Sequence, residues 1–390
     1  MTFLEALLEK KFIILFYLVA GILIYIYRKK FDVESGIAFL YRTNFGIKFM
    51  DRLANKNKEF WKIIGYIAIG VGFLGMALIF GYFIKGIYDL FFIANAPPAV
   101  GLVIPGVNIP GSPSIPFGYG MLALFLVILV HEFGHGVIAK AHGLKIKNTG
   151  FGFFGPLPLA FVEPDEKQVV KKDAVTQYSI FAAGPFFNAL LAIFAIILIA
   201  IASPLAATIS HSDGVYFNKI EKNSPAREYG IEKKVVYTEI DGVKFNSALE
   251  FAGILQNHTV NDTVVLTDKN GKDTSVVLGQ NEKTGSTYLG VSGINEKRIP
   301  NSDNIFYKSG FYILYFLTNL FQWVFTLSLG IGLANLLPLG PVDGGRMFHR
   351  AAVDIRGKEK GIKLWGTVTI ITLVILLTLL FGSIIKATLF

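Results

Sequence analysis

Long apolar segments recur along this chain, and they constrain its fold more than any other feature. A helix needs about 20 residues to cross the hydrocarbon core of a bilayer. Six segments reach or approach that length, at residues 12–27, 63–84, 119–141, 178–202, 311–335 and 366–385. With 53% hydrophobic residues, 35 of them phenylalanine, the chain is too apolar for a soluble domain. We therefore expect a polytopic α-helical membrane protein with about six transmembrane helices.

The first apolar segment, residues 12–27, is the shortest of the six, and Arg28, Lys29 and Lys30 follow it. A cleaved signal peptide carries its positive charges before the apolar run and small residues after it. The order here is the reverse, so we expect this segment to be retained as the first span.

The basic residues of the loops predict how the spans are oriented. Residues 28–62 carry nine lysines and arginines, residues 140–172 carry six and residues 346–363 carry six, whereas residues 85–118 carry one. Loops rich in lysine and arginine stay in the cytoplasm. We therefore expect a multi-pass protein of the cell membrane with both termini outside. The same bias accounts for the net charge of +9, so we expect no nucleic-acid partner.

The third apolar segment ends in the sequence His131-Glu132-Phe133-Gly134-His135. HExxH on a helix is the zinc-hydrolase signature, because histidines four residues apart share one face and can reach one ion. Glu132 points about 100° away from His131 and can deprotonate a zinc-bound water without being a ligand. Ionisable side chains inside a membrane span are costly, and hydrolysis within the bilayer would explain them. On the predicted topology the histidines lie in the cytoplasmic half of the membrane.

A zinc hydrolase needs a third protein ligand, and the fourth position is left to water. The chain has no cysteine, so the ligand must be histidine, aspartate or glutamate. Glu163 and Asp173 are nearby candidates. Asp343 is favoured because it follows a proline- and glycine-rich break at the end of the fifth span, at the depth predicted for His135. The four remaining histidines are weaker candidates, because they lie near charged edges or in a polar segment: His142, His211, His258 and His349.

Two segments differ from the apolar helices. Residues 146–164 interleave glycine, phenylalanine and proline, which excludes a regular helix. They fit a re-entrant β-hairpin that could pair with an extended substrate, or an interfacial loop with its phenylalanines in lipid. Residues 210–295 are more charged, with short strand-like runs and a strong hairpin signal at Asn270-Gly271. They predict a small β-rich domain, which the charge bias places outside the cytoplasm.

Three membrane motifs together resemble the site-2 protease family of intramembrane zinc metalloproteases. They are the HExxH sequence, Gly184-Pro-Phe-Phe-Asn188, and Asn335-Leu-Leu-Pro338-Leu-Gly-Pro-Val-Asp343-Gly-Gly. The family often has leucine before the aspartate, where this chain has valine. The 210–295 segment resembles a PDZ domain, a common insertion in the family, through Asn223-Ser-Pro-Ala-Arg, Ile240-Asp-Gly-Val and Tyr288-Leu-Gly-Val. The resemblance covers about residues 118–390.

The resemblance implies roles for individual residues. His131, His135 and Asp343 would bind one zinc ion per chain, and Glu132 would be the general base and later the proton donor. Asn188 would donate a hydrogen bond to the developing oxyanion or position the peptide. Asn335 and Pro338 would contact the substrate backbone.

The predicted organisation has four parts. Residues 1–117 hold two spans and a Pro/Gly-rich external loop, 118–209 the first part of the catalytic core, 210–295 the PDZ-like domain and 296–390 the second part of the core. The expected activity is cleavage of transmembrane substrates, and the resemblance implies that another protease trims these substrates beforehand. The alternatives are a non-catalytic scaffold with structural zinc and a zinc transporter. A scaffold does not need Glu132, and a transporter would need further polar sites along a path.

Overall fold

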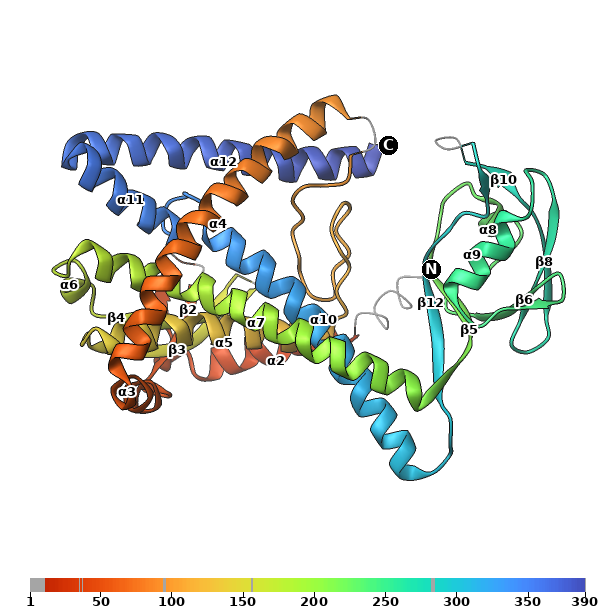
Figure 1. Ribbon diagram of the computed structural model, residues 1–390, viewed down its shortest axis with the longest axis horizontal. Helices are drawn as coiled ribbons and strands as arrows, with labels where there is room; N and C mark the ends of the chain where they lie inside the picture. Colours follow the sequence, from red (N-terminus) through yellow and green to blue (C-terminus); the bar gives the residue numbers. More distant parts are fainter. Residues whose placement is uncertain are drawn as a thin grey trace. The chain divides into compact units, whose positions relative to one another are not determined.

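The computed structural model describes residues 11–34, 36, 38–93, 96–155, 157–281 and 285–389. The chain divides into two compact units, one of residues 1–199 and 318–390 and the other of residues 200–317. The second unit contains the whole segment 210–295. Figure 1 draws both units.

Five helices are long and apolar enough to cross a membrane: α4 (Lys58–Phe92), α5 (Phe117–Ala141), α7 (Ala174–Thr208), α10 (Ile305–Asn335) and α12 (Lys358–Leu389). They contain five of the six predicted spans, so the chain is a multi-pass membrane protein. The first predicted span is α2 (Lys11–Ile26), which has only 16 residues. A sixth crossing therefore stays a prediction. Residues 96–116 form neither helix nor strand, as their prolines and glycines predict.

The loop predicted at residues 28–62 is folded, which its sequence pattern did not indicate. It contains a short 3₁₀ helix η1 (Arg28–Lys30), β1 (Asp32–Glu34), β2 (Ala38–Thr43) and the amphipathic helix α3 (Ile47–Lys56). Met50 and Ala54 of α3 are buried with Val137 and Ala141 of α5. Gly136 permits this packing, since a Cβ atom added there would lie 2.2 Å from the Met50 sulfur.

Residues 146–164 form a β-hairpin, as one of the two interpretations predicted. β3 (Ile146–Phe154) pairs antiparallel with β4 (Leu157–Pro164), and the sheet order is β1-β2-β3-β4. β2 adds to β3 with Thr43 opposite Thr149. β4 is therefore an outer strand of this sheet, and it packs against α5 (Figure 1).

Short elements complete the unit of residues 1–199 and 318–390. The turn α6 (Glu166–Val169) precedes α7, and α11 (Asp343–Arg356) lies between α10 and α12 in sequence. Ala68 and Met76 of α4, Ile138 of α5, Ala182 of α7 and Met347 of α11 belong to one buried cluster. This cluster joins the predicted catalytic helices to the second span and to α11.

The unit of residues 200–317 contains a six-stranded sheet, as its strand-like runs predict. Its order is β12-β5-β6-β8-β9, and β7 pairs with β6. Phe217, Phe245 and Phe251 lie in its core. Its elements are β5 (Ser210–Ile220), α8 (Pro225–Glu228), β6 (Val236–Ile240), β7 (Val243–Lys244), α9 (Ala248–Gln256), β8 (Thr263–Asp268), β9 (Asp273–Val277), β10 (Gly279–Gln280), β11 (Thr287–Tyr288) and β12 (Val291–Pro300).

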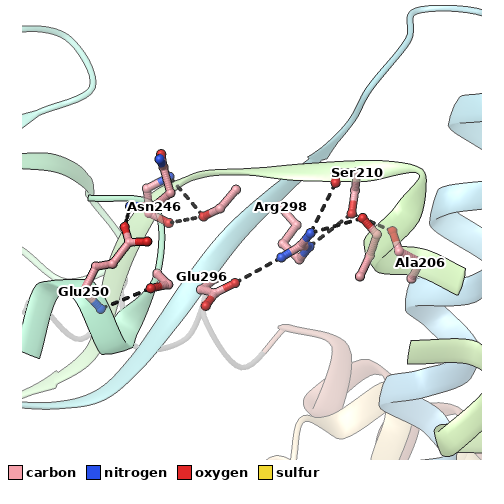
Figure 2. Close-up of polar contacts among 10 residues, drawn as sticks. Ala206, Ser210, Asn246, Glu250, Glu296 and Arg298 are labelled. Carbon is pink, nitrogen blue, oxygen red and sulfur yellow. Dashed lines mark hydrogen bonds and ion pairs between the residues drawn. The ribbon is translucent and has the colours of Figure 1, made fainter. Parts of the chain in front are cut away.

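An arginine links the first and the last strand of this unit. Arg298 near the end of β12 donates to the Ser210 hydroxyl at 3.0 Å and to the Ser210 carbonyl at 3.2 Å (Figure 2). It also donates to Glu296 at 3.1 Å, and the Ser210 hydroxyl donates to the carbonyl of Ala206. The first residue of β5 is therefore held to the last residues of β12.

Candidate metal centre

Three side chains with metal-binding atoms converge, although one of them lies more than 200 residues after the other two in the sequence. His131 and His135 come from α5 and Asp343 from the first residue of α11. Oδ2 of Asp343 lies 3.1 Å from Nε2 of His131 and 3.3 Å from Nε2 of His135, and the two Nε2 atoms are 3.2 Å apart. Each of the three residues is at most 9% exposed. The structure thus brings together the two histidines and the favoured third candidate.

Two glycines allow Asp343 to reach this place. The α10 helix ends at Asn335, and the chain turns through residues 336–342 before α11 begins. A Cβ atom on Gly344 would lie 2.2 Å from the Leu336 carbonyl oxygen, and one on Gly345 would lie 2.4 Å from the Gly340 oxygen. The Asp-Gly-Gly sequence therefore lets the first turn of α11 pack directly on the preceding backbone.

The same arrangement explains where a cation fits. Oδ2 of Asp343 is buried and, although both Nε2 atoms lie within 3.3 Å of it, it forms no hydrogen bond among the described residues. A buried carboxylate oxygen normally requires a donor or a cation. The donor set of two imidazole nitrogens and one carboxylate oxygen is that of catalytic zinc sites, which keep a fourth position for water. The residues present therefore fit a zinc ion.

The tautomer of His135 is fixed by a backbone carbonyl. Its Nδ1 lies 2.7 Å from the carbonyl oxygen of Ile180 on α7 and donates to it, because that oxygen can only accept. Nε2 then carries a lone pair toward Asp343 and His131. His131 has a different neighbour at Nδ1, the side-chain amide of Asn188, at 3.1 Å.

Glu132 faces the outer strand of the hairpin. Its Oε2 accepts a hydrogen bond from the backbone N–H of Val162 on β4 at 2.9 Å. Backbone groups alternate along a strand, so this N–H belongs to the side of β4 that does not pair with β3. The carboxylate next to His131 is thereby held at the free edge of the sheet.

Gly184 lies against both imidazoles. A Cβ atom added to it would be 2.3 Å from Nε2 of His135 and 2.5 Å from Nε2 of His131. Only glycine leaves room there for the two histidines and anything bound to them.

The nearby rival ligands have other partners. Glu163 accepts hydrogen bonds from Arg42 at 3.0 Å and from Asn148 at 3.1 Å. Although burial opposes it, these hydrogen bonds hold the pKa of Glu163 below its ordinary value. Asp173 accepts from the backbone N–H of Thr176 at 2.9 Å at the start of α7. Both carboxylates are therefore accounted for by local structure.

The other four histidines also have structural partners. His142 lies 3.1 Å from the hydroxyl of Ser179, and burial followed by the nearby Lys62 lowers its pKa. The remaining contacts are His211 with Asn301, His258 with Asp241 and the ring of His349 against Trp365. The metal-binding group found among the described residues contains none of these four.

Asn335 and Pro338 lie close to Asp343 in the sequence. Among the described residues neither forms a hydrogen bond with His131 or His135. Asn335 is the half-buried last residue of α10, and Pro338 is buried in the turn that leads to Asp343. Their contact with substrate stays a prediction.

Arg42 connects the hairpin to the two strands that the sequence did not reveal. It forms ion pairs with Asp32 at 2.5 Å, Glu34 at 2.6 Å and Glu163 at 3.0 Å, and its side chain is 26% exposed. Glu163 follows Val162, so this network holds the part of β4 that meets Glu132. It joins β1, β2 and β4 across the sheet.

We expect Arg42→Gln to lower the free energy of unfolding by about 1–2 kcal/mol, because hydrogen bonds to charged groups contribute about 1.5–3 kcal/mol and partial exposure reduces this. Thermal unfolding in detergent measures the change, and hydrogen exchange should locate it in β3 and β4. Lys62→Gln, which breaks the exposed pair with Glu59, is the matched control and should change stability by less than about 0.5 kcal/mol. Equal exchange in the two variants would contradict the role of Arg42.

Sequence reasoning missed three contributors to the centre: the Ile180 carbonyl, the Val162 N–H and the space left by Gly184. The first two are backbone groups, which no residue type reveals. Gly184 was visible as part of a motif, but only the fold shows that it lies against the histidines.

Comparison with solved structures finds two PDZ domains of SdrC-like proteins. The one from Listeria monocytogenes is 30% identical, with a TM-score of 0.19 over 20% of this chain and 86% of its own. The one from Listeria innocua is 33% identical, with a TM-score of 0.19 over 20% of this chain and 92% of its own.

Sequence comparison finds relatives in archaea and bacteria. An uncharacterized protein of Methanocaldococcus jannaschii is 27% identical over 349 residues, which cover 87% of this chain and 84% of the relative. "Putative zinc metalloprotease CPE1693" of Clostridium perfringens is 27% identical over 34% of this chain and 45% of its own length. "Putative zinc metalloprotease Cj1068" of Campylobacter jejuni is 26% identical over 40% and 48%. The chain thus spans about half the length of these two metalloproteases.

A family profile also matches a long, continuous part of the chain. Residues 119–379 match Peptidase family M50, and this region includes all three membrane motifs and the converging His131, His135 and Asp343. It extends over more than half of the chain. The protein therefore belongs to peptidase family M50, the site-2 protease family of membrane-embedded zinc metalloproteases.

Proposed function

We propose that this protein hydrolyses peptide bonds within or next to the transmembrane segments of other membrane proteins, with one zinc ion per chain. The observation that carries the proposal is the buried convergence of His131, His135 and Asp343, with Glu132 held beside them at the free edge of β4. A metal ligand set with a separate carboxylate beside it suits hydrolysis, and a free strand edge suits the binding of an extended peptide.

Each chemical step then has a residue. His131, His135 and Asp343 would hold the zinc ion, which when bound acidifies water and polarises a carbonyl. Glu132 takes the proton of the attacking water and later gives it to the leaving amine. Its hydrogen bond from Val162 keeps the carboxylate oriented before substrate arrives. Because β4 packs on α5, the peptide and the base are brought to the same face of the helix.

The outer edge of β4 is the proposed place for the substrate backbone. A transmembrane helix hides its carbonyls in internal hydrogen bonds, so the peptide must unwind before it is attacked. An extended peptide added as a strand to β4 would recover those hydrogen bonds. The N–H groups of Ala160 and Val162 lie on the unpaired side of β4 by the alternation of the strand. The Val162 N–H donates to Glu132, so the Ala160 N–H is the one proposed to bind the substrate backbone. Asn335 at the end of α10 and Pro338 in the turn that follows it are proposed to contact the same substrate backbone.

The charge distribution supports an orientation for the proposed enzyme. The basic residues of 28–62, 140–172 and 346–363 favour a cytoplasmic place for these segments, and on this topology the metal centre would lie in the cytoplasmic half of the bilayer. The PDZ-like domain then lies outside the cytoplasm. There it would exclude bulky substrate ectodomains or bind substrate ends, which fits substrates that another protease has already trimmed.

Zinc analysis together with a cleavage assay tests the proposal. Purified wild-type protein should contain one zinc ion per chain and cleave a labelled single-span peptide in detergent. Asp343→Ala should lose both, because two histidines alone do not complete a catalytic site. Asp173→Asn is the control, because it removes a carboxylate that was a rival ligand and should leave zinc content unchanged. Full zinc content in Asp343→Ala, or wild-type zinc without cleavage, would overturn the proposal in favour of a scaffold.

A further inference from the structure

Asn188 is enclosed between two other helices beside the metal centre. It belongs to α7 and is completely buried. Its amide nitrogen as placed lies 3.1 Å from Nδ1 of His131 on α5. On the other side, a Cβ atom added to Gly332 of α10 would lie 3.2 Å from the Asn188 Cβ atom. The side chain therefore lies between α5 and α10, and its amide faces the imidazole of His131.

The amide as placed leaves one atom unexplained. Oδ1 of Asn188 is buried and has no hydrogen-bond partner among the described residues. The oxygen and nitrogen of an asparagine amide are nearly indistinguishable and are assigned from the hydrogen bonds they make. Turning the amide by 180° brings Oδ1 to the position 3.1 Å from Nδ1 of His131. The buried oxygen then has a partner if Nδ1 carries a proton.

The chemistry of a histidine ligand requires that proton. In a neutral imidazole one nitrogen carries hydrogen and the other a lone pair, and a metal binds the lone pair. Nε2 of His131 is the atom near Asp343, at 3.1 Å, so Nδ1 must be the protonated nitrogen. An amide N–H facing Nδ1 would favour the opposite tautomer. His135 solves the same problem with the carbonyl of Ile180, which accepts from its Nδ1 at 2.7 Å.

We propose that Asn188 is a positioning residue whose Oδ1 accepts the Nδ1 proton of His131 and thereby fixes the tautomer and the ring orientation of this ligand. The inference rests on the proposed function, because it requires a metal at this centre. The family resemblance assigns Asn188 a contact with the oxyanion or the peptide. Its complete burial and its contact with His131 indicate instead that the amide supports a metal ligand.

Zinc affinity separates the two roles, measured by competition with a chelator on the full-length purified protein. Loss of a group that orients a histidine ligand typically lowers metal affinity 10–100-fold. We therefore expect Asn188→Ala to bind zinc about 10–100-fold more weakly than wild type. Asn188→Asp keeps an acceptor at the same place and should stay within about threefold of wild type. Ser328→Ala, which removes a buried hydroxyl of α10, is the control and should leave zinc affinity unchanged.

Cleavage by the aspartate variant supplies the second readout. A residue that stabilises an oxyanion does so with its N–H group, and its loss costs about 10²–10³-fold in rate. Asn188→Asp has no such donor, so an oxyanion role predicts that loss with normal zinc affinity in both variants. That result would overturn the inference, and it decides the matter even if Asn188→Ala does not fold. Wild-type protein that binds no zinc would instead reject the proposed function.

Discussion

Replacing Gly184 with alanine is expected to abolish zinc binding and proteolysis together. The added methyl group would lie 2.3 Å from Nε2 of His135, 2.5 Å from Nε2 of His131 and 2.6 Å from Cε1 of His131. The two Nε2 atoms are the ligand atoms themselves, so the histidines must move apart or turn away. Loss of a group that only supports a ligand lowers affinity 10–100-fold. Direct displacement of both ligands should exceed that, and we expect a loss of at least about 100-fold in zinc affinity.

A second helical glycine provides the control for Gly184→Ala. Gly330 of α10 has open space where a Cβ atom would be. Alanine is favoured over glycine within a helix by about 1 kcal/mol, so Gly330→Ala should bind zinc and cleave like wild type. Chelator competition and the cleavage of a labelled single-span peptide measure both variants. Normal zinc affinity in Gly184→Ala would mean that the ion does not bind between these imidazoles.

Replacing Glu132 with glutamine should abolish cleavage as well, but it should leave zinc binding intact. Glutamine has the same shape, and its Oε1 can still accept the hydrogen bond that Val162 donates to Glu132. It cannot accept a proton from water. General acid–base catalysis contributes about 10²–10⁴-fold, so we expect the cleavage rate to fall by about that factor or more.

Measurement of both quantities on the same preparation checks the Glu132→Gln prediction. Zinc content should equal that of wild type, because the Glu132 side chain is held by β4 rather than by the metal-binding group. Cleavage at the wild-type rate would remove Glu132 from the mechanism. Loss of zinc together with cleavage would make it a ligand or a structural support.

The centre could be predicted where residue type and spacing carried the information. The pair His131 and His135 follows from helical geometry alone. The break after Asn335 placed Asp343 at a suitable depth, and the family motifs joined the two segments. Glu163 and Asp173 could not be excluded from the sequence, because their partners Arg42 and Thr176 are recognisable only once the chain is folded.

The fold could be predicted where the local pattern is strong. Apolar length identified the five long helices but not their ends: α4 begins at Lys58, where Asn57 caps it by accepting from the Phe60 N–H at 3.3 Å. The polar start and the apolar centre belong to one helix, but hydropathy identifies only the apolar centre. β1 and β2 were missed because strands of three and six residues among basic residues have no signal of their own. β2 forms by pairing with β3, more than 100 residues away in sequence.

The free edge of β4 bears on how an enzyme of this kind would choose its substrates. Main-chain hydrogen bonds are common to every peptide, so along this edge they give affinity without distinguishing one sequence from another. A partner would then be selected in part by how readily it gives up its helix, because its backbone groups must first leave their internal hydrogen bonds. Proteins with little sequence in common could then all be cleaved, provided that the transmembrane helix of each unwinds readily at some point. Discrimination among substrates would then depend on the parts of the protein that control how a substrate reaches β4.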